Sequence, residues 1–388
     1  MCDTFFISQK ITEDGSRIFC KNSDRPYGES QAIVLIGPET RSQNTIKATY
    51  INVGFKPAKH TIFLGKPFWM WGGEFAINEN GVCIGNEALF TKVKIKGNNG
   101  LLGMDMLRIS AEISDNAEES VGNIIELLEK YGQDANSAYN KEFRYHNSFL
   151  ITDPQKTFYI ETVGRNYAVK EIKEDFFSIS NKMQIRSKEE CILSNMESPQ
   201  KYERKLFSFL AGGTERMKKI RKEIERIFLE EKKISLKDCF RALKIHGFGP
   251  RSVCMHYGIF SPSQTANSVV VKLHKNGKII LWATGTPHAC ISLFKPFSFK
   301  SQIPNQELFL PSGKQDETLW WLSLKLHEKL FKNRKALEEF TYEINQIQDE
   351  LLSLEHQIDE KSIYEISLQS INKELQTIRK FLKELKIN

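Results

Sequence analysis

The first two dozen residues constrain the fold most strongly, because they place a cysteine directly behind Met1 at the start of a strand-forming segment. Residues 4–8 and 17–21 are short runs rich in strand-forming side chains, and residues 13–16 supply a turn between them. A hairpin whose pairing is centred near residues 13–14 brings Cys2 opposite Asp24 and Arg25. The sequence therefore predicts an N-terminal β-hairpin with Cys2 within cross-strand reach of a charged cluster.

The position of Cys2 also suggests chemistry. Removal of Met1 would leave Cys2 with a free α-amino group beside its own thiol. Such an amino group has a pKa of about 7.7–8.0 and can act as a base near neutral pH, and a thiol is easily ionised. Asp24 could hold the ammonium form, while Lys21 or Arg25 favours the thiolate. The alternative interpretation is a buried cysteine on an ordinary strand, followed by a solvated charge cluster.

Composition excludes several classes of protein. The chain has 388 residues, of which 11% are aromatic, so it can bury a substantial core. No apolar run approaches the ~20 residues of a membrane span, and we see no signal-peptide pattern, so we expect a cytoplasmic protein. The seven cysteines are scattered without a CxxC pair, which suggests neither disulfides nor a zinc site. A net charge of +7 arises from lysines interleaved with glutamates, and no nucleic-acid motif accompanies it.

Residues 68–88 contain the next strong signal. Asn80-Gly81 lies between two apolar runs and predicts a tight turn in a second hairpin. Trp69 and Trp71 either line a pocket or fill the core, and with Glu74 we assign them to substrate binding. Two helices and a meander of four strands follow, and Asn181 ends the last of these strands. The predicted helices cover residues 101–113 and 115–132, and the strands cover residues 146–152, 157–163, 167–172 and 176–181.

The second half of the chain begins with charged helices and returns to strands at residues 252–258, 267–273 and 278–283. From about residue 316 apolar residues recur in steps of three and four, in two series that are out of phase. This tail is predicted to form helices with a break near residues 359–366, which dock on the body or form a dimer seam. The order of elements predicts an α+β fold, a four-layer αββα sandwich. We expect one domain over residues 2–312 and a helical, coiled-coil-like extension over residues 313–388.

Several short stretches, spread in order along residues 2–297, carry a family resemblance. They are Cys2-Asp3-Thr4-Phe5, Lys21-Asn22-Ser23-Asp24-Arg25-Pro26, Asn78-Glu79-Asn80-Gly81-Val82-Cys83-Ile84-Gly85-Asn86-Glu87-Ala88, Leu102-Gly103-Met104-Asp105, Ile179-Ser180-Asn181, Ser252-Val253-Cys254-Met255-His256, Ser263-Gln264-Thr265 and Leu293-Phe294-Lys295-Pro296. Together they resemble the secernin family and the wider group of cysteine dipeptidases and linear-amide hydrolases with N-terminal nucleophiles. The resemblance implies an N-terminal-nucleophile hydrolase fold with Cys2 as the nucleophile.

The resemblance also implies roles for other residues. Asp24 matches an aspartate near the nucleophile, whereas Lys21 stands where related amide hydrolases carry an arginine. Asn181 matches the amide that stabilises the oxyanion, and a second donor comes from Asn86 or the backbone beside it. Arg251 is assigned the role of the distal arginine of these amide hydrolases.

The resemblance implies the activity of a cysteine amidohydrolase, and within that class a dipeptidase acting on small peptides or acyl-amides, without a metal or an organic cofactor. Two alternatives share this scaffold: a non-catalytic, secernin-like regulatory protein, and an acyltransferase. A third alternative is a conventional dyad of Cys254 and His256, which point to one face if residues 252–258 form a strand. The C-terminal helices offer a surface for a homo-oligomer.

Overall fold

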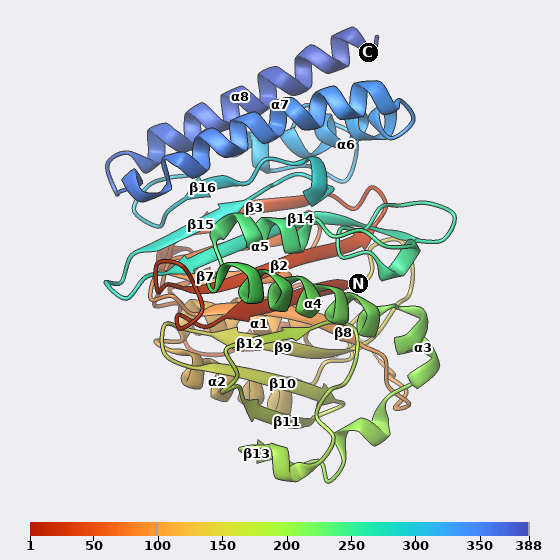
Figure 1. Ribbon diagram of the computed structural model, residues 1–388. Helices are drawn as coiled ribbons and strands as arrows, with labels where there is room; N and C mark the ends of the chain where they lie inside the picture. The colour runs from red at the N-terminus through yellow and green to blue at the C-terminus, as the bar shows by residue number, and fades with distance from the viewer. Residues whose placement is uncertain (98–99, 387–388) are drawn as a thin grey trace.

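The computed structural model describes residues 1–97 and 100–386, and two antiparallel sheets form its centre (Figure 1). The six-stranded sheet has the order β12 (Phe176–Ile179), β1 (Cys2–Ile7), β2 (Arg17–Pro26), β14 (Ser263–Leu273), β15 (Ile279–Ala283) and β16 (Lys295–Phe297). The eight-stranded sheet has the order β13 (Leu193–Ser194), β11 (Asn166–Glu171), β10 (Thr157–Val163), β9 (His146–Thr152), β8 (Cys83–Leu89), β7 (Phe75–Asn78), β6 (Ile62–Pro67) and β3 (Gln31–Ile36). A separate ribbon pairs β4 (Thr45–Lys47) with β5 (Asn52–Gly54).

Helices cover the outer face of each sheet and complete the predicted αββα sandwich. The eight-stranded sheet carries α1 (Gly103–Ile113) and α2 (Ala117–Tyr131). The six-stranded sheet carries α4 (Gly213–Glu231) and α5 (Leu236–Leu243), and the short α3 (Lys205–Leu210) precedes α4. The last three helices are α6 (Leu319–Leu330), α7 (Arg334–Ser353) and α8 (Ile363–Glu384). In the described part of the chain no helix is both long and apolar enough to cross a bilayer.

The two sheets are held together by aromatic side chains that point into the space between them. Phe19 from the N-terminal hairpin joins Phe63 and Phe75 of the other sheet, and all three are fully buried. Gly85 of β8 allows a close approach here, because a Cβ atom at this position would lie 2.7 Å from the Thr4 hydroxyl. The strand that begins with Cys2 is therefore packed directly against β8.

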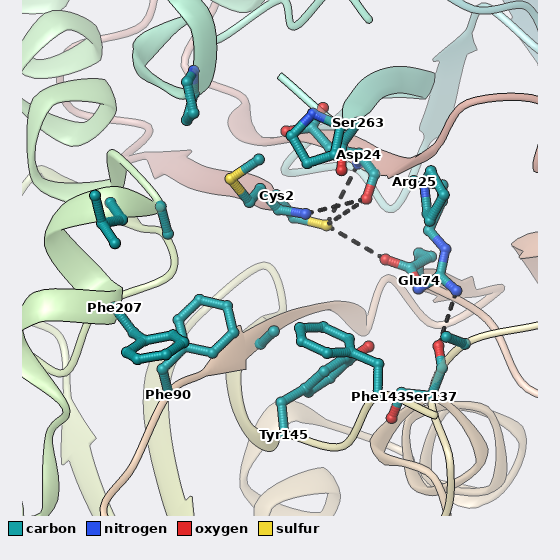
Figure 2. Close-up of a pocket in the computed structure, with 18 of the residues that line it drawn as sticks. Cys2, Asp24, Arg25, Glu74, Phe90, Ser137, Phe143, Tyr145, Phe207 and Ser263 are labelled. Carbon is teal, nitrogen blue, oxygen red and sulfur yellow. Dashed lines mark hydrogen bonds and ion pairs between the residues drawn. The ribbon is translucent and has the colours of Figure 1, made fainter. Parts of the chain in front are cut away.

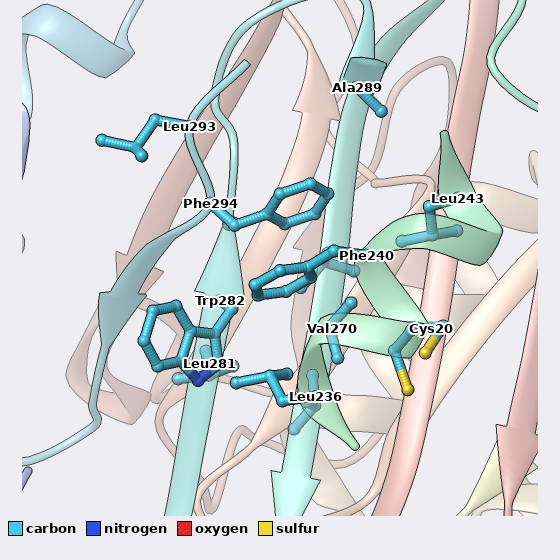
Figure 3. Packing of buried hydrophobic residues seen from close by; sticks show 14 of the residues in the cluster. Cys20, Leu236, Phe240, Leu243, Val270, Leu281, Trp282, Ala289, Leu293 and Phe294 are labelled. Carbon is cyan, nitrogen blue, oxygen red and sulfur yellow. The ribbon is translucent and has the colours of Figure 1, made fainter. Parts of the chain in front are cut away.

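The apolar side chains of α5 recur with a helical period because one face of this helix packs on the outer face of the six-stranded sheet. Leu236, Phe240 and Leu243 of α5 point toward Val270 and Trp282 on the strands beneath (Figure 3). The Phe240 ring stacks on Phe294 with centroids 4.2 Å apart. These contacts bury the apolar face of a short helix, whose stability comes from packing rather than from length.

Two predicted strands differ in the structure. The fourth strand of the meander, β12, leaves the eight-stranded sheet and pairs with β1, so Ile179 lies opposite Thr4. Residues 252–258 form no strand and follow the short 3₁₀ helix η4 (Gly249–Arg251), because their backbone groups bond to a loop rather than to a ladder. The crossing of β12 brings Asn181 beside the N-terminus, which a continuous meander would not do.

The C-terminal helices dock on the body of the protein. In Figure 1, α7 and α8 lie side by side beyond β16, and α8 packs against that strand. Lys295 of β16 and Glu374 of α8 form a fully buried ion pair at 2.5 Å, and Trp320 Nε1 donates to the carbonyl of Ala266 at 2.8 Å. Residues 354–362 separate the two long helices, close to the predicted break. The domain boundary at residues 312–313 and the coiled-coil character stay predictions.

Candidate active site

Cys2 is the first residue of β1, a central strand between β12 and β2, and its side chain is buried. Cys2 pairs with Ser23 rather than with Asp24 and Arg25, so the expected register is wrong by one or two residues. The connection between the strands runs over residues 8–16 instead of a tight turn, which moves the centre of pairing. Asp24 still reaches the nucleophile, because its backbone N–H donates to Cys2 Sγ at 3.4 Å.

A buried arginine from α4 organises the backbone around Cys2. Arg216 is fully buried, and its Nε lies 2.8 Å from a carboxylate oxygen of Asp3. Its Nη2 donates to Ser180 Oγ and to Asn181 Oδ1, each at 2.7 Å, and reaches the Cys2 carbonyl at 3.3 Å. One guanidinium thus joins β1, the end of β12 and α4.

This arrangement corrects the assignment of the distal arginine. Arg251 lies on η4 with an exposed side chain, and its guanidinium packs over Phe209 with 5.6 Å to the ring centroid. Arg216, and not Arg251, contacts the strand that begins with Cys2. A sequence signal for Arg216 does exist, since it continues the buried stripe of Ile220, Ile224 and Ile227 on α4. A buried arginine on such a stripe needs a carboxylate partner, and only the fold shows that this is Asp3.

The amide of Asn181 faces the backbone nitrogen of Cys2. Asn181 Oδ1 accepts a hydrogen bond from that nitrogen at 3.1 Å, and Asn181 Nδ2 donates to the carbonyl of Ala88 at 2.9 Å. Because Cys2 and Arg216 both donate, the oxygen must point toward them and the NH₂ group away. Asn181 therefore lies beside the site as predicted, but it presents an acceptor where an oxyanion donor was expected.

Asn86 is better placed for contact with a substrate. It lines the pocket next to Cys2, and its Nδ2 donates to Asn147 Oδ1 at 2.8 Å. A side-chain amide carries two N–H groups, so this hydrogen bond uses one of them. The orientation of Asn86 is thus set by Asn147 from β9.

The surroundings of the Cys2 sulfur favour the neutral thiol over the thiolate. Burial raises the pKa of the Cys2 thiol to about 12, Lys21 lowers it, and Glu74 raises it further. Glu74 Oε2 lies 3.3 Å from Cys2 Sγ, close enough to accept the thiol proton in a hydrogen bond. A thiol in this setting needs a nearby base before it can react.

Asp24 has one carboxylate oxygen without a partner among the described residues. Its Oδ1 accepts a hydrogen bond from Thr265 Oγ1 at 2.6 Å, whereas the buried Oδ2 has none. Burial raises the pKa of Asp24 to about 6, and the chain's amino-terminal charge and Arg216 oppose that shift. The Met1 nitrogen donates to the Asp24 carbonyl at 3.2 Å, so the amino end of the chain lies beside this carboxylate.

Lys21 lies on the same strand pair as Cys2 but bonds elsewhere. Its Nζ lies 2.9 Å from Glu87 Oε1 and 2.9 Å from the carbonyl of Asn86, and both charged side chains are fully buried. Thr4 donates to the same Glu87 oxygen. The lysine influences the thiol through its charge rather than through a hydrogen bond.

A cavity of about 320 Å³ opens beside Cys2. Figure 2 shows its two sides: Cys2, Asp24, Arg25 and Glu74 lie together, and aromatic rings face them. The rings belong to Phe90, Phe143, Tyr145 and Phe207. The cavity therefore combines a charged end at the sulfur with an apolar wall.

The two predicted substrate-binding tryptophans lie behind this cavity rather than in its wall. Trp69 Nε1 donates to Glu29 at 2.8 Å, and Glu29 in turn pairs with Arg25. Trp71 packs against Arg108, whose guanidinium is 3.9 Å from the ring centroid. Glu74 does line the cavity, because β7 begins directly after it and its side chain reaches Cys2; its part in substrate binding stays a prediction.

The two stacked sheets between helices, with Cys2 on a central strand facing a cavity, define an N-terminal-nucleophile hydrolase fold. A solved variant of the conjugated bile acid hydrolase from Clostridium perfringens matches with a TM-score of 0.51 at 15% identity, over 76% of this chain and 92% of that one. Another variant of that hydrolase gives 0.49 at 14%, over 82% and 98%. An N-acylethanolamine-hydrolyzing acid amidase ortholog from Caenorhabditis elegans gives 0.36 at 10%, over 69% and 92%. The chain matches none of the protein-family models with which it was compared.

Proposed function

We propose that this protein is a cysteine amidohydrolase of the secernin and dipeptidase type, with Cys2 as nucleophile after cleavage of the bond between Met1 and Cys2. The observation that carries the proposal is the setting of Cys2. Its sulfur faces the cavity while its backbone nitrogen is bonded to Asn181. Cleavage would turn that nitrogen into an α-amine, and the partnerless Asp24 oxygen offers a counter-charge for its ammonium form.

The reaction then follows from the contacts. The Cys2 sulfur attacks the amide carbonyl while the thiol proton passes to the α-amine. The α-amine gives this proton to the departing amine, which leaves a thioester on Cys2 that water hydrolyses. The Asp24 N–H, 3.4 Å from the sulfur, stabilises negative charge there. Asn86 is the side chain we assign to the oxyanion, because it lines the cavity, and Asn181 is assigned to hold the α-amine.

The cavity favours a substrate with a cationic end and an apolar group. Glu74 lines this end of the cavity, and its partner Arg25 also pairs with Glu29 behind the wall, so one guanidinium is shared by two carboxylates and Glu74 suits an α-ammonium. The aromatic wall suits an apolar side chain, and the exposed Lys141 at the cavity suits a carboxylate. These features support a dipeptide with an apolar residue, which carries all three groups.

The test combines protein chemistry with a substrate panel. Intact mass should show the loss of Met1, and a thiol-directed alkylating agent should label Cys2 in the processed protein. Free dipeptides with apolar residues should be cleaved, N-acetylated ones much less, and the Cys2→Ala variant should cleave none. The matched control is Cys191→Ala, which alters a half-buried cysteine outside the cavity.

Three results would decide against the proposal. A processed protein that cleaves no member of a panel of dipeptides and acyl-amides would favour the non-catalytic alternative. Full activity in Cys2→Ala would remove the nucleophile. Products that shift from acid to amide when a free amine is added would identify acyl transfer instead of hydrolysis.

A further inference from the structure

Two cysteines and two histidines converge outside the cavity beside Cys2. His246 follows α5, Cys254 and His256 belong to the irregular residues 252–258, and Cys290 lies on the 3₁₀ helix η5 (Ala289–Ile291). The four candidate ligand atoms all lie within 4.8 Å of one another. His256 Nε2 is 3.6 Å from Cys254 Sγ and 3.3 Å from Cys290 Sγ. None of the four lines the cavity beside Cys2, so the reaction proposed above does not use them.

These separations are close to those of a tetrahedral metal site. Bonds of about 2.3 Å from zinc to sulfur and about 2.05 Å to nitrogen place sulfur and nitrogen about 3.6 Å apart, and two sulfurs about 3.8 Å apart. The observed distance of 3.6 Å to Cys254 equals the first value, and the observed 3.3 Å to Cys290 is slightly shorter. We propose that His246, Cys254, His256 and Cys290 bind one Zn²⁺ ion as a structural site with four protein ligands.

The chemistry of the ligands fits zinc in particular. Two thiolates and two neutral imidazoles around a divalent cation make a neutral centre, which lowers the cost of burying it. Sulfur and imidazole ligands select a borderline or soft metal and not Mg²⁺ or Ca²⁺, which prefer oxygen. Cys254 is buried and His246 is exposed, so the site is closed on the side of Cys254 and open to solvent on the side of His246, where an ion can enter.

Hydrogen bonds already hold the ligand segments in place. The backbone N–H groups of Val253 and Cys254 both donate to the carbonyl of Ile245, each at 3.0 Å. Ser252 Oγ donates to the Gly247 carbonyl at 2.7 Å and accepts from the Gly247 N–H at 2.9 Å. His246 and Cys254 therefore sit on two segments that are clamped together, so metal binding needs little ordering of the chain.

Aromatic packing and a constrained backbone support the other two ligands, His256 and Cys290. The His256 ring packs against Phe331, at the end of α6, with centroids 4.5 Å apart, and against His288 at 4.8 Å. His288 has a left-handed backbone, with φ of 64°, directly before the helix that carries Cys290. A non-glycine residue in this conformation costs free energy and persists where its surroundings require it.

The zinc site would stabilise the segment that supports Asp24. The Met255 N–H donates to Thr265 Oγ1 at 2.8 Å, and that hydroxyl donates to Asp24 Oδ1 at 2.6 Å. Met255 lies between the ligands Cys254 and His256. Zinc binding would thus hold the backbone behind a carboxylate of the candidate active site, although the proposal for the metal itself does not rest on the proposed reaction.

The sequence showed no sign of this site because the ligands come from distant segments. Cys290 is 34 residues from His256, and no CxxC pair marks the set. The expectation of a chain without a zinc site rested on that spacing. The proposed dyad of Cys254 and His256 was suggested by a strand that does not form, yet the two side chains meet as part of this larger cluster.

The test uses the full chain purified without chelators and then exposed to Zn²⁺. We expect one zinc ion per chain by elemental analysis after desalting, and a higher melting temperature with zinc than after chelation. Cobalt added to the metal-free wild-type protein should give thiolate-to-cobalt charge-transfer bands and the intense visible bands of tetrahedral Co²⁺. Cys290→Ser should lose the bound zinc and these bands, whereas Cys191→Ser, also at a half-buried free cysteine, should keep both.

Several outcomes would overturn the proposal. Zinc well below one equivalent together with an absence of cobalt–thiolate bands in the folded wild-type protein would exclude the site. A wild-type mass lower by two hydrogen atoms, mapped to a Cys254–Cys290 disulfide that persists under the purification conditions, would assign the pair to a disulfide instead. Zinc that remains bound in both Cys290→Ser and the exposed-ligand variant His246→Ala would place the metal elsewhere. Because the cobalt spectrum needs no variant, a folding failure of Cys290→Ser leaves the test intact.

Discussion

Replacing Arg216 by methionine tests the ion pair that joins α4 to the strand of the nucleophile. Arg216 and Asp3 are both fully buried, and the guanidinium Nε lies 2.8 Å from the carboxylate. The substitution keeps a long side chain but leaves Asp3 charged and without its partner. Removing one member of a buried ion pair costs about 3–5 kcal/mol of folding free energy. We expect Arg216→Met to lower the free energy of unfolding by an amount in this range.

The matched control lies on the same helix. Arg226 pairs with Glu223 and Glu230 on the exposed side of α4, where solvent screens the charges. Arg226→Met makes the same chemical change in the same element, and we expect a much smaller loss, because exposed ion pairs contribute little. The comparison separates the cost of an unpaired buried carboxylate from the effect of the substitution on the helix.

A second substitution should recover part of the loss. Asp3→Asn removes the unpaired charge, so the double variant Arg216→Met with Asp3→Asn should be more stable than Arg216→Met alone. Urea denaturation, followed by circular dichroism at constant pH, measures all four proteins. The reasoning would be refuted if Arg216→Met cost no more than Arg226→Met, or if Asp3→Asn lowered stability further in the Arg216→Met background.

Three further predictions concern the site and the core. Asn181→Ala should lower kcat, because the α-amine is no longer held in place, and should move the acid limb of kcat/KM to lower pH, because the α-ammonium loses an acceptor. A fall in kcat of roughly 10²–10³ with an unshifted acid limb would instead favour the oxyanion role. Phe207→Ala should lower kcat/KM for substrates with aromatic groups by roughly fivefold, which corresponds to about 1 kcal/mol of apolar contact. Leu206→Ala, at an exposed position on the same helix, should leave kcat/KM unchanged, and equal effects of the two substitutions would contradict the assignment of Phe207 to the apolar wall of the cavity. Burial raises the pKa of Glu161 from 4.5 to about 7, so the native state holds a proton that the unfolded state loses, and stability should fall as pH rises through this window. The free energy of unfolding should therefore differ between pH 4.5 and pH 7.5 by at most about 3 kcal/mol on account of Glu161, and Glu161→Gln should remove this difference in urea denaturation. If the free energy of unfolding of the variant changes with pH as much as that of the wild type, another group is responsible.

Local patterns were sufficient to predict most elements of this fold. The hairpin at Asn80-Gly81 and the helix that ends at Gly132 lie where their turn and cap residues indicate, since both signals act over a few residues. Asn116 caps α2 by accepting a hydrogen bond from the backbone of Glu119. The order of these elements was enough to predict two sheets between helical layers, because few other arrangements bury all of the apolar faces.

The site was harder to predict, because its contacts depend on distances across the fold. Cys2 and Asp24 could be placed near each other from one hairpin. The pairing of Asp3 with Arg216 joins residues 213 positions apart, and periodicity marks Arg216 only as buried. The direction of the Asn181 amide is decided by two donors, one of which belongs to that unpredicted arginine.

The sequence by itself determined most of the secondary structure and the layered fold class, because these depend on local backbone preferences and on the period of apolar side chains. It also placed the candidate nucleophile, because Cys2 directly follows Met1. The tertiary structure decided which buried charges are paired, which way the Asn181 amide faces, and that two cysteines and two histidines meet. Those contacts form between segments far apart in the chain. Their geometry follows from the packing of whole sheets and helices, which no local pattern specifies.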